Sequence, residues 1–268
     1  MKKFVLFLSL IILISSCSKV PVTNRKQMNL VSESELMKMS LTSYNEFLSE
    51  NPPMSDSAAN VQMVKRIGSK ISTAVEKFLG DHKMGDRVEG YNWEFNLVNS
   101  DQLNAWCMPG GKVVVYTGLL PVTKDEKGLA FVMGHEVAHA VARHGNERMS
   151  QNLLAQTGAV ALDAALYDKP DETRDLFNTA YGVGAQVGGI LPFSRLHESE
   201  ADKLGMIFMA MAGYDPSEAP KVWQRMIDLN KGPKPLEIMS THPSDDKRIA
   251  DIKAYVPHAI KYYRQEGE

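Results

Sequence analysis

The chain has 268 residues, of which 44% are hydrophobic and 23% are charged. This length and composition suit a protein with a full hydrophobic core, and they exclude a disordered, collagen-like or coiled-coil chain. Lysine and arginine number 30 against 32 aspartate and glutamate residues, so the formal charge is −2, and the sequence pI is near 6.4. Without a basic excess we expect no nucleic-acid partner. With only Cys17 and Cys107 present, a fold held by several disulfides and a zinc site of several thiolates are also excluded.

The N-terminus has the pattern of a secretory signal. Lys2 and Lys3 precede an apolar run over residues 4–14, and small residues follow just before Cys17. The run is shorter than the roughly 20 residues that a membrane-spanning helix needs. The sequence Ile-Ser-Ser-Cys that ends at Cys17 also resembles the bacterial lipobox, in which the cysteine is lipidated and becomes the mature N-terminus.

This pattern predicts three parts of the chain. Residues 1–16 are expected to be a lipoprotein signal peptide, residues 17–31 a tether that begins at the lipidated Cys17, and residues 32–268 a single domain. The lipid predicts attachment to a membrane. No acidic residue directly follows Cys17, and by resemblance this favours the periplasmic face of the outer membrane in a bacterial cell envelope.

The sequence of the first half of the domain predicts two helices followed by a small sheet. Ser32 and Glu35 form a capping-box pattern at the start of an amphipathic helix that ends before residues 51–53. A second helix is expected over about residues 55–78 because apolar residues recur at helical spacing. The alternation around Phe95 predicts a half-buried strand. Residues 103–108 and 112–120 predict two strands, which are joined by a tight hairpin at Pro109-Gly110-Gly111.

The second half of the domain is expected to be helical. The pattern from Asp125 to about His144 is strongly apolar, and Gly145 is placed as the C-cap of this helix. A glycine-rich stretch over residues 182–189 and Pro192 interrupt the helices that follow. The order of helices, a small sheet and more helices predicts a predominantly helical α+β fold in one domain.

The apolar helix carries the sequence His135-Glu136-Val137-Ala138-His139. His135 and His139 lie one turn apart on the same face, so both imidazoles can bind one metal ion. Zinc held in this way lowers the pKa of a bound water toward about 7, and the adjacent Glu136 carboxylate can accept its proton. The motif therefore predicts a hydrolytic zinc site in which Glu136 is the general base.

A third protein ligand must come from another part of the chain. His144, five residues beyond His139, falls roughly 140° away from the ligand face. Downstream, Glu198 and Asp202 share one helical face, which suits Glu198 as ligand and Asp202 as the hydrogen-bond partner of a ligand histidine. Glu200 points the opposite way and suits a solvated position at a helix start. Glu200 and His197 nevertheless remain the alternatives to Glu198 as third ligand.

Several stretches resemble one family of zinc endopeptidases, which includes HtpX and the CAAX prenyl proteases. The pair HEVAH at 135–139 and SRLHESEAD at 194–202 carries the resemblance. The stretches PVTNRKQMNLVSESE, NAWCMPGGKVVVYTGLL and STHPSDDKRIADI add to it, so that it runs from about residue 17 to 255. The soluble envelope lipoprotein branch of the family is the most similar, although Asn24 stands where a glycine is more usual.

The resemblance implies a gluzincin-like fold with a small sheet beside the active-site helix. It implies one zinc ion per chain, held by His135, His139 and Glu198, with Glu136 as general base and Asp202 as partner of a ligand. It also implies that the strand at Asn104, Ala105 and Trp106 borders the cleft, where a substrate could add as a further strand. His242 is the second polar element, and it either stabilises the oxyanion or covers the metal when the enzyme is idle.

The predicted function is that of a zinc-dependent endopeptidase. Its expected substrates are unfolded or misassembled proteins of the cell envelope, because recognition through the backbone leaves sequence preference broad. The alternative is a chaperone or assembly factor that binds such proteins in the cleft and cuts them rarely.

Overall fold

The computed structural model describes residues 17–263 except 168, 170, 186–190, 231–235 and 244–245. The predicted signal peptide, residues 1–16, lies outside the described residues. Among the described residues, no helix has the length and apolar composition needed to cross a membrane.

A three-stranded sheet follows the predicted pattern. Strands β4 (Ala105–Met108) and β5 (Lys112–Tyr116) form an antiparallel hairpin, and β3 (Glu94–Val98) pairs with β5 in parallel. Gly110 and Gly111 have φ values of 93° and 81°, which the tight turn needs and which only glycine adopts without strain. In the order β3-β5-β4, the described chain gives β4 one neighbouring strand, so β4 is an edge strand.

Two helices precede this sheet as expected. Helix α2 (Glu33–Glu50) begins at Ser32, whose hydroxyl accepts a hydrogen bond from the backbone N–H of Glu35. Helix α3 (Ala59–Asp81) begins four residues later than predicted, because the Ser55 and Ser57 hydroxyls bond each other at 2.9 Å in a local turn. The apolar stripe of α3 is buried in the main core.

Helix α5 (Glu126–Val141) carries the HExxH motif and ends earlier than predicted. Its N-terminus is capped by Asp125, which accepts from the backbone N–H of Gly128. The chain then breaks at Arg143, which has a left-handed φ of 59°, and α6 (His144–Ala165) starts immediately. The predicted C-cap at Gly145 is therefore wrong, because Gly145 lies in the first turn of α6. Because of this break, the His144 side chain points in a different direction from the one it would have if α5 continued straight.

Helix α8 (Leu191–Met211) crosses α5 at a contact between two glycines. A Cβ atom added at Gly134 would lie 2.9 Å from the carbonyl oxygen of Gly205, and one added at Gly205 would lie 2.8 Å from the backbone nitrogen of His135. Any larger residue at either position must push the backbones apart. The two glycines thus set the short distance between the helix that carries His135 and the helix that carries Glu198.

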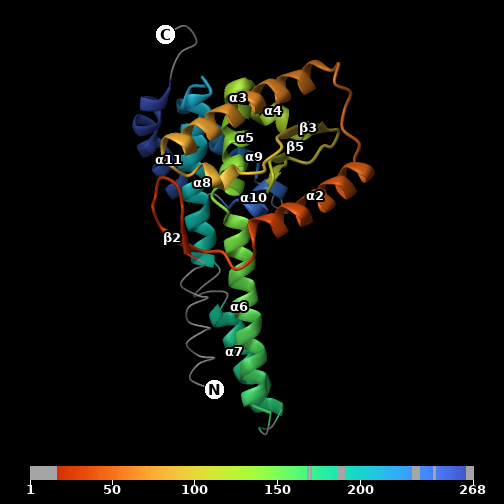
Figure 1. The fold of residues 1–268 in the computed structure, drawn as a ribbon, viewed down its shortest axis with the longest axis vertical. Helices are drawn as coiled ribbons and strands as arrows, with labels where there is room; N and C mark the ends of the chain where they lie inside the picture. The colour runs from red at the N-terminus through yellow and green to blue at the C-terminus, as the bar shows by residue number, and fades with distance from the viewer. Residues whose placement is uncertain are drawn as a thin grey trace.

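The remaining elements are helical. Short segments are η1 (Gly85–Val88), η2 (Thr117–Leu119), α4 (Leu120–Thr123), η4 (Pro216–Glu218) and η5 (Ile260–Tyr262). Longer ones are α7 (Asp171–Ala185), α9 (Ala219–Leu229), α10 (Glu237–Thr241) and α11 (Asp246–Ala259). The structure confirms the predominantly helical α+β class. Helix α7 runs through Gly182, which was expected to lie in an interruption, and α6 and α7 together project from the body as a paired arm (Figure 1).

The segment expected to be a tether packs against the domain instead. Strands β1 (Cys17–Lys19) and β2 (Lys26–Met28) form an antiparallel hairpin, which we call the N-terminal hairpin. Val20, in its connecting loop, is fully buried in the main core. Without apolar periodicity the segment shows no sequence signal for this packing, which depends on Val20 and on the polar contacts of Arg25 described below.

Candidate metal centre

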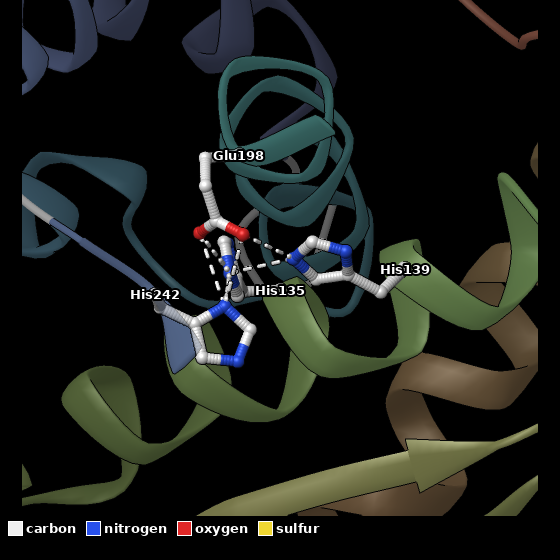
Figure 2. Close-up of side chains that lie close together, drawn as sticks. All are labelled: His135, His139, Glu198 and His242. Atoms are coloured by element: carbon white, nitrogen blue, oxygen red, sulfur yellow. Dashed lines mark hydrogen bonds and ion pairs between the residues drawn. The ribbon is translucent and has the colours of Figure 1, made fainter. Parts of the chain in front are cut away.

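Four side chains from three helices converge at the centre of the molecule (Figure 2). We call this set the ligand group: His135 and His139 from α5, Glu198 from α8, and His242 at the end of α10. The two Nε2 atoms of His135 and His139 are 3.1 Å apart. His242 Nδ1 lies 3.3 Å from His135 Nε2 and 3.0 Å from Glu198 Oε2. Glu198 Oε1 lies 3.3 Å from His139 Nε2.

These separations fit a tetrahedral zinc site. Zinc binds imidazole nitrogen and carboxylate oxygen at about 2.0–2.2 Å, so two such ligands at a tetrahedral angle lie roughly 3.3 Å apart. The separations that involve His135 or Glu198 run from 3.0 to 3.4 Å, and all four ligand atoms lie within 4.8 Å of one another. Three ring nitrogens and a carboxylate that converge in a buried place are a donor set that zinc prefers. The donor set therefore fits zinc, and His242 presents a fourth donor atom beside the three predicted ligands.

Asp202, which the sequence predicts as the partner of a ligand histidine, lies beside His135. Asp202 Oδ1 lies 3.0 Å from His135 Nδ1, on the side of the ring that faces away from the ligand group. Arg248 donates two hydrogen bonds to this carboxylate, at 2.7 and 2.8 Å, and Trp223 donates a third. Burial alone would raise the pKa of Asp202, but Arg248 and His135 outweigh it and lower this pKa to about 2. An ionised Asp202 keeps the proton on Nδ1 of His135 and leaves Nε2 free to bind metal.

Glu136 lies next to the ligand group without belonging to it. Its side chain is buried, and Oε1 has no hydrogen-bond partner among the described residues. The imidazole Nε2 of His242 lies 3.5 Å from Oε1 of Glu136. Burial raises the pKa of Glu136, while His242 and His135 oppose that shift. A buried carboxylate with a free oxygen beside a metal site is suited to accept a proton from water.

A cavity of roughly 260 Å³ opens on this site, and Glu136, His139 and His242 line it together with Trp106. The three residues expected at the cleft strand occupy different positions. Ala105 is buried in the main core, and the carbonyl of Asn104 accepts from the backbone N–H of Tyr116 within the sheet. Trp106 is the one of these three that lines the cavity.

Glu200 and His197, the alternatives for the third ligand, face away from the ligand group. Glu200 is 1% exposed, so the expected solvated position is wrong. It lies in the middle of α8 and receives hydrogen bonds from Arg25, while His197 contacts Glu147 at 2.9 Å. His144, which helical spacing placed away from the ligand face, has its Nδ1 3.0 Å from Nδ1 of His139. The left-handed Arg143 makes this contact possible, and arginine gives no sequence signal for that conformation.

Two histidines one helical turn apart, joined by a glutamate from a later helix, form the metal-binding arrangement of zinc peptidases. The comparison with known proteins agrees with this class. Peptidase family M48 matches residues 69–256, and the chain belongs to this family. The family membership confirms the resemblance noted in the sequence, the class of zinc metallopeptidase and zinc as the cofactor.

Named relatives fall into two groups. The mitochondrial metalloendopeptidase OMA1 of Schizosaccharomyces pombe is 35% identical over 243 residues, which are 90% of this chain and 66% of that protein. The protein of the same name from Arabidopsis thaliana is 42% identical over 62% of this chain and 32% of its own length. The beta-barrel assembly-enhancing protease of Yersinia pestis is 32% identical over 60% of this chain and 34% of its own. The chain thus spans between about a third and two thirds of the length of these relatives.

The comparisons correct the predicted location. Relatives that match over 90% of this chain are mitochondrial proteins, whereas the beta-barrel assembly-enhancing proteases match over 60%. The prediction of a bacterial outer-membrane location is therefore wrong. A short apolar run before a cysteine is typical of a targeting segment, and this pattern does not by itself identify the destination.

Proposed function

We propose that this chain is a zinc-dependent endopeptidase that cleaves unfolded or misassembled polypeptides in a quality-control role. The observation that carries the proposal is the position of Glu136, a buried carboxylate with an unpartnered oxygen beside a complete set of zinc ligands. The name of the beta-barrel assembly-enhancing relatives supports a link between proteolysis and protein assembly.

The residues divide the reaction between them. Zinc, when bound by His135, His139 and Glu198, supplies a Lewis acid that polarises the scissile carbonyl and activates water. Glu136 takes the proton from the attacking water and later gives it to the leaving amine. Asp202, held by Arg248, keeps His135 in the tautomer that binds metal.

Substrate binding follows from the edge position of β4. An extended peptide can pair with the free edge of this strand through backbone hydrogen bonds, and Trp106 then meets its side chains in the cavity. Because such pairing needs an extended segment, folded proteins are poor substrates and unfolded ones are good substrates.

We assign the covering role to His242. Its Nδ1 lies 3.3 Å from His135 Nε2 and 3.0 Å from Glu198 Oε2, so it would bind a zinc ion held by the other ligands at the place that water or a substrate carbonyl needs during hydrolysis. An oxyanion-binding residue would leave that position open. The arrangement is therefore a resting state, and His242 must move away before cleavage.

The same observation favours a second candidate function. A protein whose metal is covered turns over slowly, so it could act mainly as a chaperone or assembly factor that binds unfolded clients along β4. Membrane attachment through a lipid on Cys17, after removal of residues 1–16, stays a prediction under either function.

Cleavage of casein by the zinc-loaded protein tests the enzymatic proposal. Glu136→Gln keeps the shape and burial of the side chain but cannot accept a proton, so we expect about one zinc ion per chain and a loss of at least about 100-fold in rate. Asp81→Asn, on an exposed ion pair of α3, is the control for handling and folding. Casein cleavage by Glu136→Gln at the parental rate would refute the general base. No cleavage by the parental protein, with tight casein binding, would favour the chaperone.

A further inference from the structure

A second buried polar cluster lies directly behind the zinc ligands. We call it the arginine cluster: Arg25 from the N-terminal hairpin, His144 and Glu147 from α6, and His197 and Glu200 from α8. Arg25 donates to both carboxylates, at 2.7 Å to Glu147 and at 3.0 Å to Glu200. Arg25 thus links the N-terminal hairpin to helices α6 and α8 beside the metal site.

The two carboxylates of the arginine cluster each contact one histidine. His144 Nε2 lies 3.1 Å from Glu200, and His197 Nε2 lies 2.9 Å from Glu147. The two imidazole rings stack at 4.3 Å between centroids. Of the pair, His144 is the ring that reaches a zinc ligand, through its contact with Nδ1 of His139.

The positions of the protons on His144 and His139 follow from which group accepts each hydrogen bond. An ionised Glu200 accepts, so His144 carries its proton on Nε2 and presents the lone pair of Nδ1. His139 must then donate its own Nδ1–H to His144, which leaves Nε2 of His139 as a lone pair directed at the other ligands.

We propose that Arg25 and Glu200 hold His144 as the hydrogen-bond acceptor that orients the zinc ligand His139, so that the N-terminal hairpin positions the metal site. The two α5 ligands thereby have different supports. His135 is oriented by a carboxylate, Asp202, and His139 by a neutral imidazole that a carboxylate and an arginine hold in turn. The proposal rests on the zinc site of the proposed function and not on proteolysis.

Substitutions at His144 separate hydrogen bonding from packing. Leucine and asparagine have nearly the same shape, but asparagine can place an oxygen close to the position of Nδ1. Loss of a partner that orients a ligand typically weakens metal binding 10- to 100-fold, and we expect this for His144→Leu. His144→Asn should bind zinc within about threefold of the parental protein, because the acceptor for His139 is kept.

The two glutamates provide a matched pair. Glu200→Gln and Glu147→Gln each remove a single negative charge that pairs with both Arg25 and a histidine. Of the two histidines, only His144, the partner of Glu200, contacts His139. We expect Glu200→Gln to weaken zinc binding by about three- to tenfold and Glu147→Gln to change it by less than about twofold.

Zinc affinity is measured by competition with a chromophoric chelator on the full chain, and the visible absorption spectrum of the Co²⁺ form reports ligand geometry. Thermal unfolding of the zinc-free proteins shows whether each variant folds. The expected result is a weakened affinity and an altered Co²⁺ spectrum in His144→Leu and Glu200→Gln, with both restored toward parental in His144→Asn.

Two outcomes would overturn the proposal. One is parental zinc affinity and an unchanged Co²⁺ spectrum in His144→Leu. The other is an equal loss of affinity in Glu147→Gln and Glu200→Gln, which would make the arginine cluster a general stabilising element. These readouts do not involve casein, so a protein that passes them and fails to cleave casein refutes the proposed function alone.

Discussion

The ligand group and the arginine cluster are built from similar side chains, yet they balance charge in different ways. Both are buried, both contain histidines and carboxylates, and both draw on α8, where Glu198 and Glu200 point to opposite sides. In the arginine cluster, the guanidinium of Arg25 donates to each carboxylate. In the ligand group, ring nitrogens face each other at 3.1 and 3.3 Å.

The difference between the two clusters shows which contacts identify a metal-binding site in a protein structure. A buried cluster that includes its own cation can satisfy every acceptor, as the arginine cluster does for Glu147 and Glu200. In the ligand group, Arg248 contacts Glu198 at 2.9 Å, but among the described residues no cationic side chain lies between the converging nitrogens of His135, His139 and His242, where a metal ion can bind. The density of histidines and glutamates alone does not distinguish the two, and the direction of the hydrogen bonds does.

The largest effect is expected for a zinc ligand. His135→Ala removes one of the converging nitrogens, so we expect zinc affinity to fall by more than about 100-fold, beyond the range of supporting residues. Arg25→Gln should keep nearly full zinc occupancy at saturating zinc. Metal analysis after dialysis measures both. Full occupancy in His135→Ala would contradict the ligand assignment and remove the distinction between the clusters.

A smaller effect is expected when the cover of the metal is removed. If about nine tenths of the molecules hold His242 on the metal, His242→Ala should raise the initial rate of casein cleavage by up to about tenfold. Zinc should stay bound, because His135, His139 and Glu198 remain. A rate lowered 10- to 1000-fold would instead assign His242 to the oxyanion. Initial rates at saturating zinc decide between the two signs.

The smallest effect is a pH dependence specific to the arginine cluster. Burial alone would raise the pKa of Glu147, but Arg25 and His197 outweigh it and lower the pKa to about 2. Because the folded pKa is below the ordinary value, the stabilisation is complete above about pH 4.5 and is lost as pH falls toward 2. Zinc-free parental protein should lose about 1–2 kcal/mol of unfolding free energy between pH 5.5 and 3 through this carboxylate, after allowance for the partial exposure of Arg25.

The test of this effect is urea unfolding of zinc-free protein at both pH values. Glu147→Gln should flatten the dependence by that amount. Asp81→Asn should leave it unchanged, because Asp81 and its partner Lys77 are exposed and such pairs contribute little. An equal flattening in both variants would show that Arg25 does not hold Glu147 in solution.

Sequence patterns alone were enough for the local elements and for part of the site. The capping pattern at Ser32, the hairpin around Gly110 and Gly111, and the i,i+4 pair His135 and His139 depend on residues close in the chain. The spacing of Glu198 and Asp202 also belongs to a single helix, so their shared face could be predicted.

What the sequence by itself determined, therefore, is which helix carries the metal motif and that Glu198 and Asp202 share one face of α8. The tertiary structure alone decided how His242 reaches the fourth position, why Glu200 is buried, and where His144 points. Each of these depends on contacts between distant parts of the chain: α10 over the site, Arg25 from the N-terminal hairpin, and the left-handed turn at Arg143. Periodicity describes neighbours along one helix, and it holds no information about a side chain that arrives from elsewhere.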